Sequence, residues 1–150
     1  MRLYSILFVM LLGFIASCEN DCLYGKIKLH VKSTESCDEF YCIDVSNGHL
    51  YVKTQMIDVL TLDTIIKNDS LLLSVSDQNE LSRLARKVLD GRETDSKGFV
   101  HDGIMCLLQV NSHKDKFFPY GDSIKMTPQW NLYQFLMKKA PFKMELHTGT

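Results

Sequence analysis

The chain has 150 residues, of which 45% are hydrophobic and 23% are charged, and its formal net charge is −1. A chain of this length builds one domain with a real core, and its apolar content excludes an intrinsically disordered protein. Because the charges nearly balance, the composition gives no electrostatic reason to expect a nucleic-acid partner or attraction to an anionic lipid surface.

The first residues form the pattern of a secretory signal peptide. Arg2 is the charged residue of the start, and an uncharged, mostly apolar stretch runs from Ile6 to Ala16. A charged start, an apolar run of this length and small residues behind it are typical of a cleaved signal peptide. The run is shorter than the roughly 20 apolar residues that a transmembrane helix needs. We therefore expect residues 1–17 to be removed and the rest of the chain to be exported.

The residues around the expected cleavage point are Ile15-Ala16-Ser17-Cys18. This segment resembles the lipobox of bacterial lipoproteins, in which an aliphatic residue and two small residues precede a cysteine. The resemblance covers residues 1–18 and implies that Cys18 becomes the N-terminus and carries a diacylglycerol and an acyl chain such as palmitate. Two or more buried chains anchor a protein stably. The expected location is a bacterial membrane, facing the periplasm or the cell exterior; ordinary cleavage before Cys18 would instead release a soluble protein.

The remaining cysteines form an even set, which suits the oxidising environment outside the cytoplasm. They are Cys22, Cys37, Cys42 and Cys106. Four cysteines allow three complete pairings, and their spacing does not choose among them. A zinc site would need closely spaced cysteine or histidine pairs, which are missing, so we expect disulfides and neither a metal nor another cofactor. Four buried thiols remain the alternative.

Residues 18–25 are mostly polar and are interpreted as a lipidated tether, and residues 26–150 as a single domain. Apolar and polar residues alternate from Lys26 to Lys32, which predicts a half-buried strand. Two further strands, Phe40–Val45 and Leu50–Thr54, flank Asn47-Gly48, the sequence that favours a tight hairpin turn. With a two-residue loop, Val45 faces Leu50 and the apolar residues of both strands share one side, so this register is well specified.

Further along, residues 57–66 and 71–75 are interpreted as a second hairpin with its turn at 67–70. A helix is expected from Asp77 as N-cap, with Glu80 completing a capping box and Gly91 at the end. Residues 104–110 form an apolar run that suits a buried strand or a helix, and 111–122 are expected to be a loop.

Thr127 and Pro128 are typical of a helix start, as N-cap and first residue, and Pro141 ends that helix. Strands gathered first and helices later favour an α+β fold over alternating βαβ units. The prediction is an antiparallel sheet of about four to five strands with two helices packed on it.

No segment of the chain matches a catalytic motif such as GxSxG, HExxH or a phosphate-binding loop. His101 and His113 lie near carboxylates, but Cys106 sits in an apolar run where a thiol is inert, so no catalytic residue is assigned. Phe117, Phe118 and Tyr120 cluster in the expected loop. They are candidate partner-binding residues, although such a loop can also fold onto the core.

We expect a lipid-anchored binding protein of the cell envelope, of an inhibitor or immunity type, that recognises a protein or an envelope component. The membrane contact is the lipid on Cys18. The alternative is a small envelope hydrolase that uses His101 or His113 as a general base. The two classes differ in geometry, because the hydrolase needs a histidine, a carboxylate and a nucleophile within hydrogen-bond reach of one another.

The anchor can be tested by intact-mass spectrometry of protein purified from membranes without reducing agent. We expect a chain that begins at Cys18 and is heavier by a diacylglycerol and an acyl group, and whose mass rises by two hydrogens for each disulfide opened on reduction. An unmodified mature chain would rule out the lipoprotein, and retention of residues 1–17 would rule out export.

Overall fold

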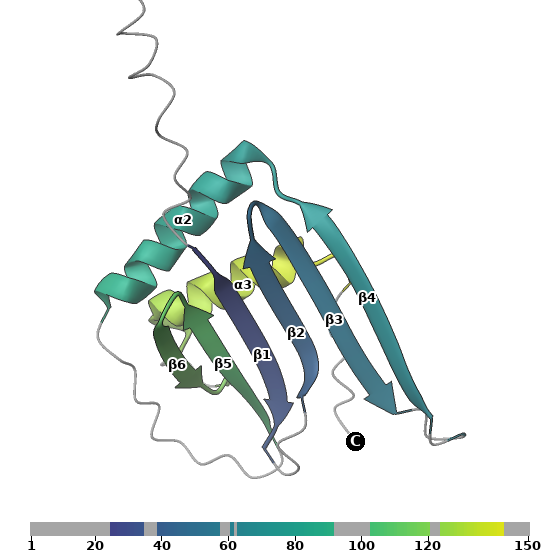
Figure 1. The fold of residues 1–150 in the computed structure, drawn as a ribbon. Coiled ribbons are helices and arrows are strands. Elements are labelled where there is room, and N and C mark those ends of the chain that lie inside the picture. The colour runs from purple at the N-terminus through teal and green to yellow at the C-terminus, as the bar shows by residue number, and fades with distance from the viewer. Residues whose placement is uncertain are drawn as a thin grey trace, which may run out of the picture.

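The computed structural model describes residues 25–34, 39–57, 61, 63–91, 103–120 and 124–142. They form a six-stranded sheet with two α-helices and a short 3-10 helix packed on it (Figure 1). The predicted α+β class is confirmed, but the sheet has six strands and not four to five. The elements are β1 (Ile27–Ser33), β2 (Glu39–Ser46), β3 (His49–Ile57), β4 (Thr64–Leu72), α2 (Val75–Asp90), β5 (Ile104–Val110), β6 (His113–Phe117), η1 (Ile124–Met126) and α3 (Pro128–Lys139).

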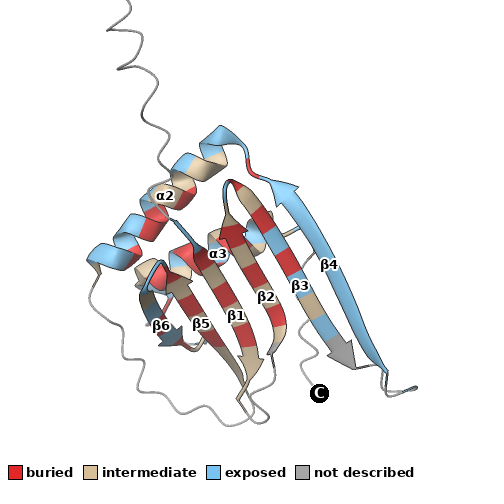
Figure 2. Ribbon diagram, viewed as in Figure 1, coloured by how far each residue is buried: buried red, intermediate tan, exposed pale blue. Residues whose placement is uncertain are grey.

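The strands lie in the order β4-β3-β2-β1-β5-β6, and every neighbouring pair is antiparallel. Both helices cover one face of this sheet, which we call the covered face, and leave the other face uncovered (Figure 1). Figure 2 shows buried and less buried residues alternating along the inner strands. On β1, Ile27, Leu29 and Val31 are fully buried against the helices, as the alternation from Lys26 to Lys32 predicts.

The β2–β3 hairpin has the register that its sequence predicts, with Val45 opposite Leu50 and Ile43 opposite Val52. Asn47 and Gly48 both have positive φ, at 50° and 77°, as the tight turn requires. The hairpin tip also contacts the start of α2, because the Gly48 carbonyl accepts a hydrogen bond from Leu73 N–H at 2.9 Å. The turn therefore fixes both the sheet register and the point where the chain leaves β4 for the helix.

The two helices are capped by hydroxyl side chains and joined by an ion pair. Ser74, and not Asp77 as predicted, is the N-cap of α2, so this helix begins three residues earlier than expected. Thr127 caps α3 with Pro128 as its first residue, which confirms the prediction. Lys139 Nζ lies 2.6 Å from Asp77 Oδ1, and this hydrogen bond lowers the pKa of the Asp77 carboxyl.

The prediction of a second hairpin with its turn at residues 67–70 is wrong. These residues lie in the middle of β4, which pairs with β3 from His49–Leu72 to Ile57–Thr64. All nine residues of β4 are exposed. Because this edge strand buries neither of its sides, it shows no apolar alternation, and its polar centre was interpreted as a turn.

The expected loop at 111–122 contains another strand, β6, paired with β5 from Val110–His113 to Cys106–Phe117. Its covered-face position next to Phe117 is Asp115, which breaks the apolar pattern by which a strand is recognised. The run at 104–110 is the strand β5, which decides between the strand and the helix that its sequence left open. Among the described residues, no helix is both long enough and apolar enough to span a bilayer.

The hairpin turn yields a stability prediction. A Cβ added at Gly48 would lie 3.0 Å from Gln78 Nε2. The substituted residue would also have to keep the backbone angle φ at +77°. We expect Gly48→Ala to lower the free energy of unfolding by about 1–2 kcal/mol, measured by urea denaturation, because the left-handed conformation costs this much for a residue with a Cβ. Asn47→Gly is the control, with an expected change of less than about 0.5 kcal/mol. Equal effects of the two substitutions would contradict this account.

Candidate binding surface

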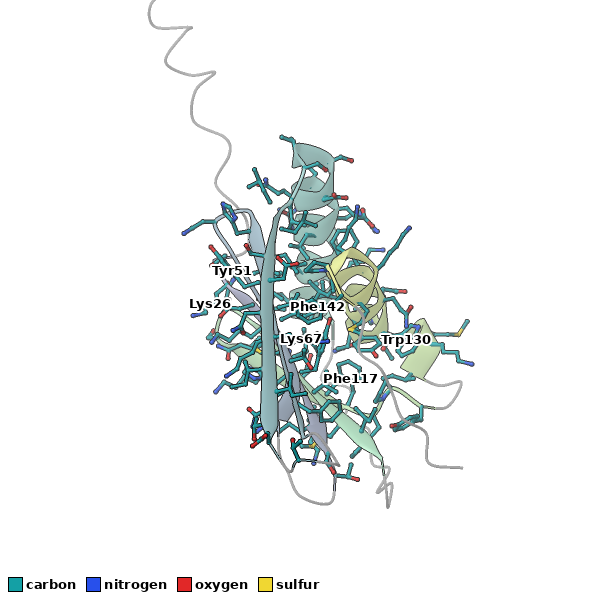
Figure 3. All side chains as sticks on the ribbon, turned by 90° about the vertical axis from the view of Figure 1, so that its right-hand side faces the viewer. Lys26, Tyr51, Lys67, Phe117, Trp130 and Phe142 are labelled. Carbon is teal, nitrogen blue, oxygen red and sulfur yellow. The ribbon has the colours of Figure 1, made fainter. Side chains whose placement is uncertain are left out.

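The uncovered face of the sheet carries a group of basic side chains on β1 and β6. These strands flank β5, and their outward residues are half-buried or exposed. We define the basic surface by Lys26, which immediately precedes β1, and the outward residues of the two strands: Lys26, Lys28, His30, Lys32, Lys114 and Lys116. Figure 3 shows Lys26 and Tyr51 on the side of the sheet away from the helices, whereas Phe117, Trp130 and Phe142 lie on the helix side.

The register places the basic side chains in rows across the sheet. Lys28 lies opposite Gln109, which in turn lies opposite Lys114. In the next row, His30 lies opposite Leu107, and Leu107 lies opposite Lys116. Cations from both sides therefore flank the uncharged strand β5. Between them the surface forms a hollow of about 320 Å³ with His30, Lys32, Leu107, Gln109, Lys114 and Lys116 in its lining.

Asp44 on β2 balances part of this positive charge. Its Oδ2 atom lies 3.2 Å from Lys28 Nζ and 3.9 Å from Lys26 Nζ. The hydrogen bond to Asp44 raises the pKa of Lys28, which keeps this amine charged. This acid lies at the β2 side of the surface, so the excess of positive charge lies toward β6.

The lysines of β6 complete this surface, and sequence reasoning placed them in a loop. Lys116 Nζ lies 5.6 Å from the ring centroid of Phe118, within the range of a cation–π contact. The signal that could have located them is the run His113 to Phe117, in which exposed lysines alternate with buried residues. The run was missed because one of its buried residues is an aspartate.

The structure separates the three predicted partner-binding residues. Phe117 is fully buried and packs edge-on against Tyr133, with 5.9 Å between the ring centroids, so it is a core residue and unavailable to a partner. Phe118 is half-buried and follows Lys116 on the uncovered side. Tyr120 is 43% exposed, and its hydroxyl accepts a hydrogen bond from Ile104 N–H at 2.7 Å. Phe118 therefore lies beside the basic surface through its contact with Lys116, whereas Tyr120 stays a candidate contact residue outside that surface.

His113, one of the two histidines considered for catalysis, takes part in a polar cluster at the start of β6. Its Nε2 lies 3.1 Å from Asp115 Oδ2, and Gln129 Nε2 donates to the same oxygen at 2.9 Å. The carboxylate orients the imidazole as a triad would, but the third member is an amide and not a hydroxyl or thiol. His101 lies outside the described residues.

The cysteines fall on different parts of the molecule. Cys18, Cys22 and Cys37 lie outside the described residues. Cys106 is fully buried on the covered face of β5, whereas Cys42 is half-buried on the uncovered side of β2, and no disulfide joins them. Burial raises the pKa of the Cys106 thiol to about 12, so it is protonated and a poor nucleophile. Of the three pairings, the one that links Cys42 to Cys106 is excluded, and disulfides to the other cysteines stay a prediction.

The described residues gather no group of three side chains that could hold a metal ion. Neither the models of known protein families nor the sequences of curated proteins match this chain.

The buried cluster yields a second stability prediction. Gln129→Leu removes the amide donor from the Asp115 carboxylate, which is 6% exposed. It also removes Gln129 Oε1, a buried acceptor with no partner in the described part of the chain, which offsets some of the loss. We expect the free energy of unfolding to fall by about 1–2 kcal/mol. Gln134→Leu, on the exposed side of the same helix, should change it by less than about 0.5 kcal/mol. If the two variants have the same free energy of unfolding, the buried hydrogen bond adds nothing to stability.

Proposed function

We propose that the protein is a lipid-anchored binding protein of the bacterial cell envelope that holds an acidic protein partner on the uncovered face of its sheet. The observation that carries this proposal is the separation of charge: a chain of net charge −1 presents five lysines and a histidine together on β6, on β1 and on the residue before β1. The lipid on Cys18, which the lipobox-like segment predicts, supplies the location. The partner supplies the negative charge that this surface attracts.

The form of the surface supports a protein partner over a small ligand. The hollow on β5 is partly open to solvent and is spread over three strands, whose residues all contribute to its lining. Leu107 offers an apolar contact at the centre, and charged residues stand around it, an arrangement that matches the apolar centre and polar rim of protein interfaces. An inhibitor or immunity-type protein would use such a face to cover its target.

The alternative is the small envelope hydrolase with His101 or His113 in its site. The pair of His113 and Asp115 is the observation in its favour, since a buried carboxylate orients the ring. A hydrolase also needs a nucleophile beside the ring, and the neighbour that the described residues supply to this pair is the amide of Gln129. The binding protein is therefore the function that the geometry supports better.

The proposal is tested by photo-crosslinking in living cells of the source bacterium. A benzophenone amino acid replaces Leu107, at the centre of the hollow, or Leu89, which is 40% exposed on α2. We expect a discrete protein adduct from position 107 and none from position 89. Lys114→Glu combined with Lys116→Glu should reduce the adduct at least about tenfold, because like charges then face the acidic partner.

Arg86→Glu combined with Lys87→Glu is the matched control, since it reverses two exposed cations on the helix side of the molecule. It should leave the adduct from position 107 unchanged. An adduct of equal yield from both positions, no adduct from position 107, or equal losses from the two double reversals would each refute a partner on the basic surface.

A further inference from the structure

The strand β4 forms one edge of the sheet and is exposed along its whole length (Figure 2). Several of its residues are large and apolar: Ile65 is 43% exposed, Ile66 51%, Leu71 39% and Leu72 65%. In Figure 1 no described element lies beyond this strand, and in Figure 3 it is the strand nearest the viewer. An exposed edge of nine residues, apolar toward both ends and polar at its centre, is a template for pairing with another strand.

The hydrogen-bonding directions along β4 follow from its junction with the hairpin. Leu73 N–H donates to Gly48, and the pair continues the register in which Leu72 lies opposite His49. Backbone groups of an antiparallel strand alternate in direction, so residues 65, 67, 69 and 71 face β3, whereas residues 64, 66, 68, 70 and 72 face outward. Ser70 N–H accordingly bonds not to β3 but to the adjacent Asp69 side chain, at 2.7 Å.

A second β4 can pair with this edge only if the residues whose backbone groups face outward, 64, 66, 68, 70 and 72, lie opposite one another in the two copies. For two copies related by a two-fold axis, this condition is met when the axis passes through residue 67, 68 or 69, and most of the two strands then overlap. An axis at Lys67 sets Lys67 against its own copy, and an axis at Asp69 sets two aspartates together. An axis at Asn68 places Lys67 opposite Asp69 of the second copy, twice over. Like charges directly opposite destabilise a sheet and unlike charges stabilise it, so the charges select the axis at Asn68.

The same axis also matches the remaining side chains. Ile65 lies opposite Leu71 of the second copy, and the two pairs fall on the helix side, where neither residue has helical cover. These are the close, non-hydrogen-bonded positions of the ladder, where side-chain contact is strongest. On the uncovered side, the two Asn68 side chains lie next to each other and can exchange hydrogen bonds.

We propose that two copies of the protein associate edge to edge through β4, antiparallel about a two-fold axis at Asn68, and extend the sheet across both molecules. Pairing replaces the bond between Ser70 N–H and Asp69 with a bond from Ser70 to Ile66 of the second copy, and it releases the Asp69 carboxylate to Lys67. One pair of edge strands buries less than the roughly 1,200 Å² of a standard interface. The dimer should accordingly be weak, with a Kd on the order of 10–100 micromolar.

The test is sedimentation velocity over a concentration series, on the mature chain with Cys18→Ser so that no lipid drives association. We expect Lys67→Asp and Asp69→Lys each to raise the Kd at least about tenfold, because both charge pairs become repulsive. The double variant Lys67→Asp with Asp69→Lys should dimerise like the parent protein. An equimolar mixture of the two single variants should form a mixed dimer, since all its pairs are again attractive.

Lys114→Asp, on the other edge strand, is the control that should leave the Kd unchanged, and circular dichroism checks that each variant is folded. A parent protein that stays monomeric up to about 500 micromolar overturns the proposal. So does a dimer that the single reversals leave intact, or a double variant and a mixture that fail to recover it while folded. The outcome is independent of the partner on the basic surface, because none of the tested β4 residues belongs to that surface.

Discussion

The packing of two helices on only one face of the sheet is the constraint from which most of the structure follows. On the central strand β1, every second side chain is fully buried, and the others project to the side that the helices leave open. Burial of an aliphatic side chain contributes about 1.5–3 kcal/mol, so the apolar side of β1 determines which face the helices cover. The lysines and histidine of the same strand then have to lie on the uncovered face.

The connection from β4 to α2 sets how far that helical cover extends. Leu73 and Ser74 turn the chain straight from the edge strand into the helix, and Gln78 Nε2 holds this turn by donating to the Leu73 carbonyl at 2.9 Å. The helix then runs from the β4 side back toward the β5 and β6 side, along the upper ends of the inner strands, and α3 lies behind the middle of the sheet (Figure 1). Cover is thereby concentrated on the inner strands, and β4 is exposed on both sides although four of its nine residues are isoleucine or leucine.

Sequence patterns identified the elements whose burial or capping leaves a periodic trace. The alternation of β1, the Asn47-Gly48 turn with its register, and the Thr127 cap of α3 are all of this kind. The patterns failed where a strand lacks an apolar side. β4 buries no residue. In β6 a buried position is occupied by Asp115, which accepts a hydrogen bond from Gln129, and not by an apolar residue.

The sequence predicted only part of the candidate surface, because that surface also depends on strands that lie far apart in the chain or lack an apolar side. Local sequence placed Lys28 and His30 on one side of a strand, but their neighbourhood with Lys114 and Lys116 depends on the pairing of β1 with β5 and of β5 with β6. The pairing of β1 with β5 joins segments more than seventy residues apart. Phe117 shows the converse error, because an aromatic residue in an expected loop was interpreted as a contact residue although it is the last, buried position of a strand.

The edge and the uncovered face have a geometric relation that bears on both proposals. A two-fold axis between antiparallel edge strands runs perpendicular to the sheet. The uncovered faces of the two copies therefore lie on the same side of the extended sheet. The β4 dimer would therefore present two basic surfaces on one side and both helical layers on the opposite side. A partner that carries two acidic sites, or that is itself dimeric, would engage both copies, and its second contact would form at a high effective concentration. Association through β4 and binding at the two basic surfaces would then reinforce one another. A partner bound to both copies stabilises the dimer, and the dimer offers the partner its second surface.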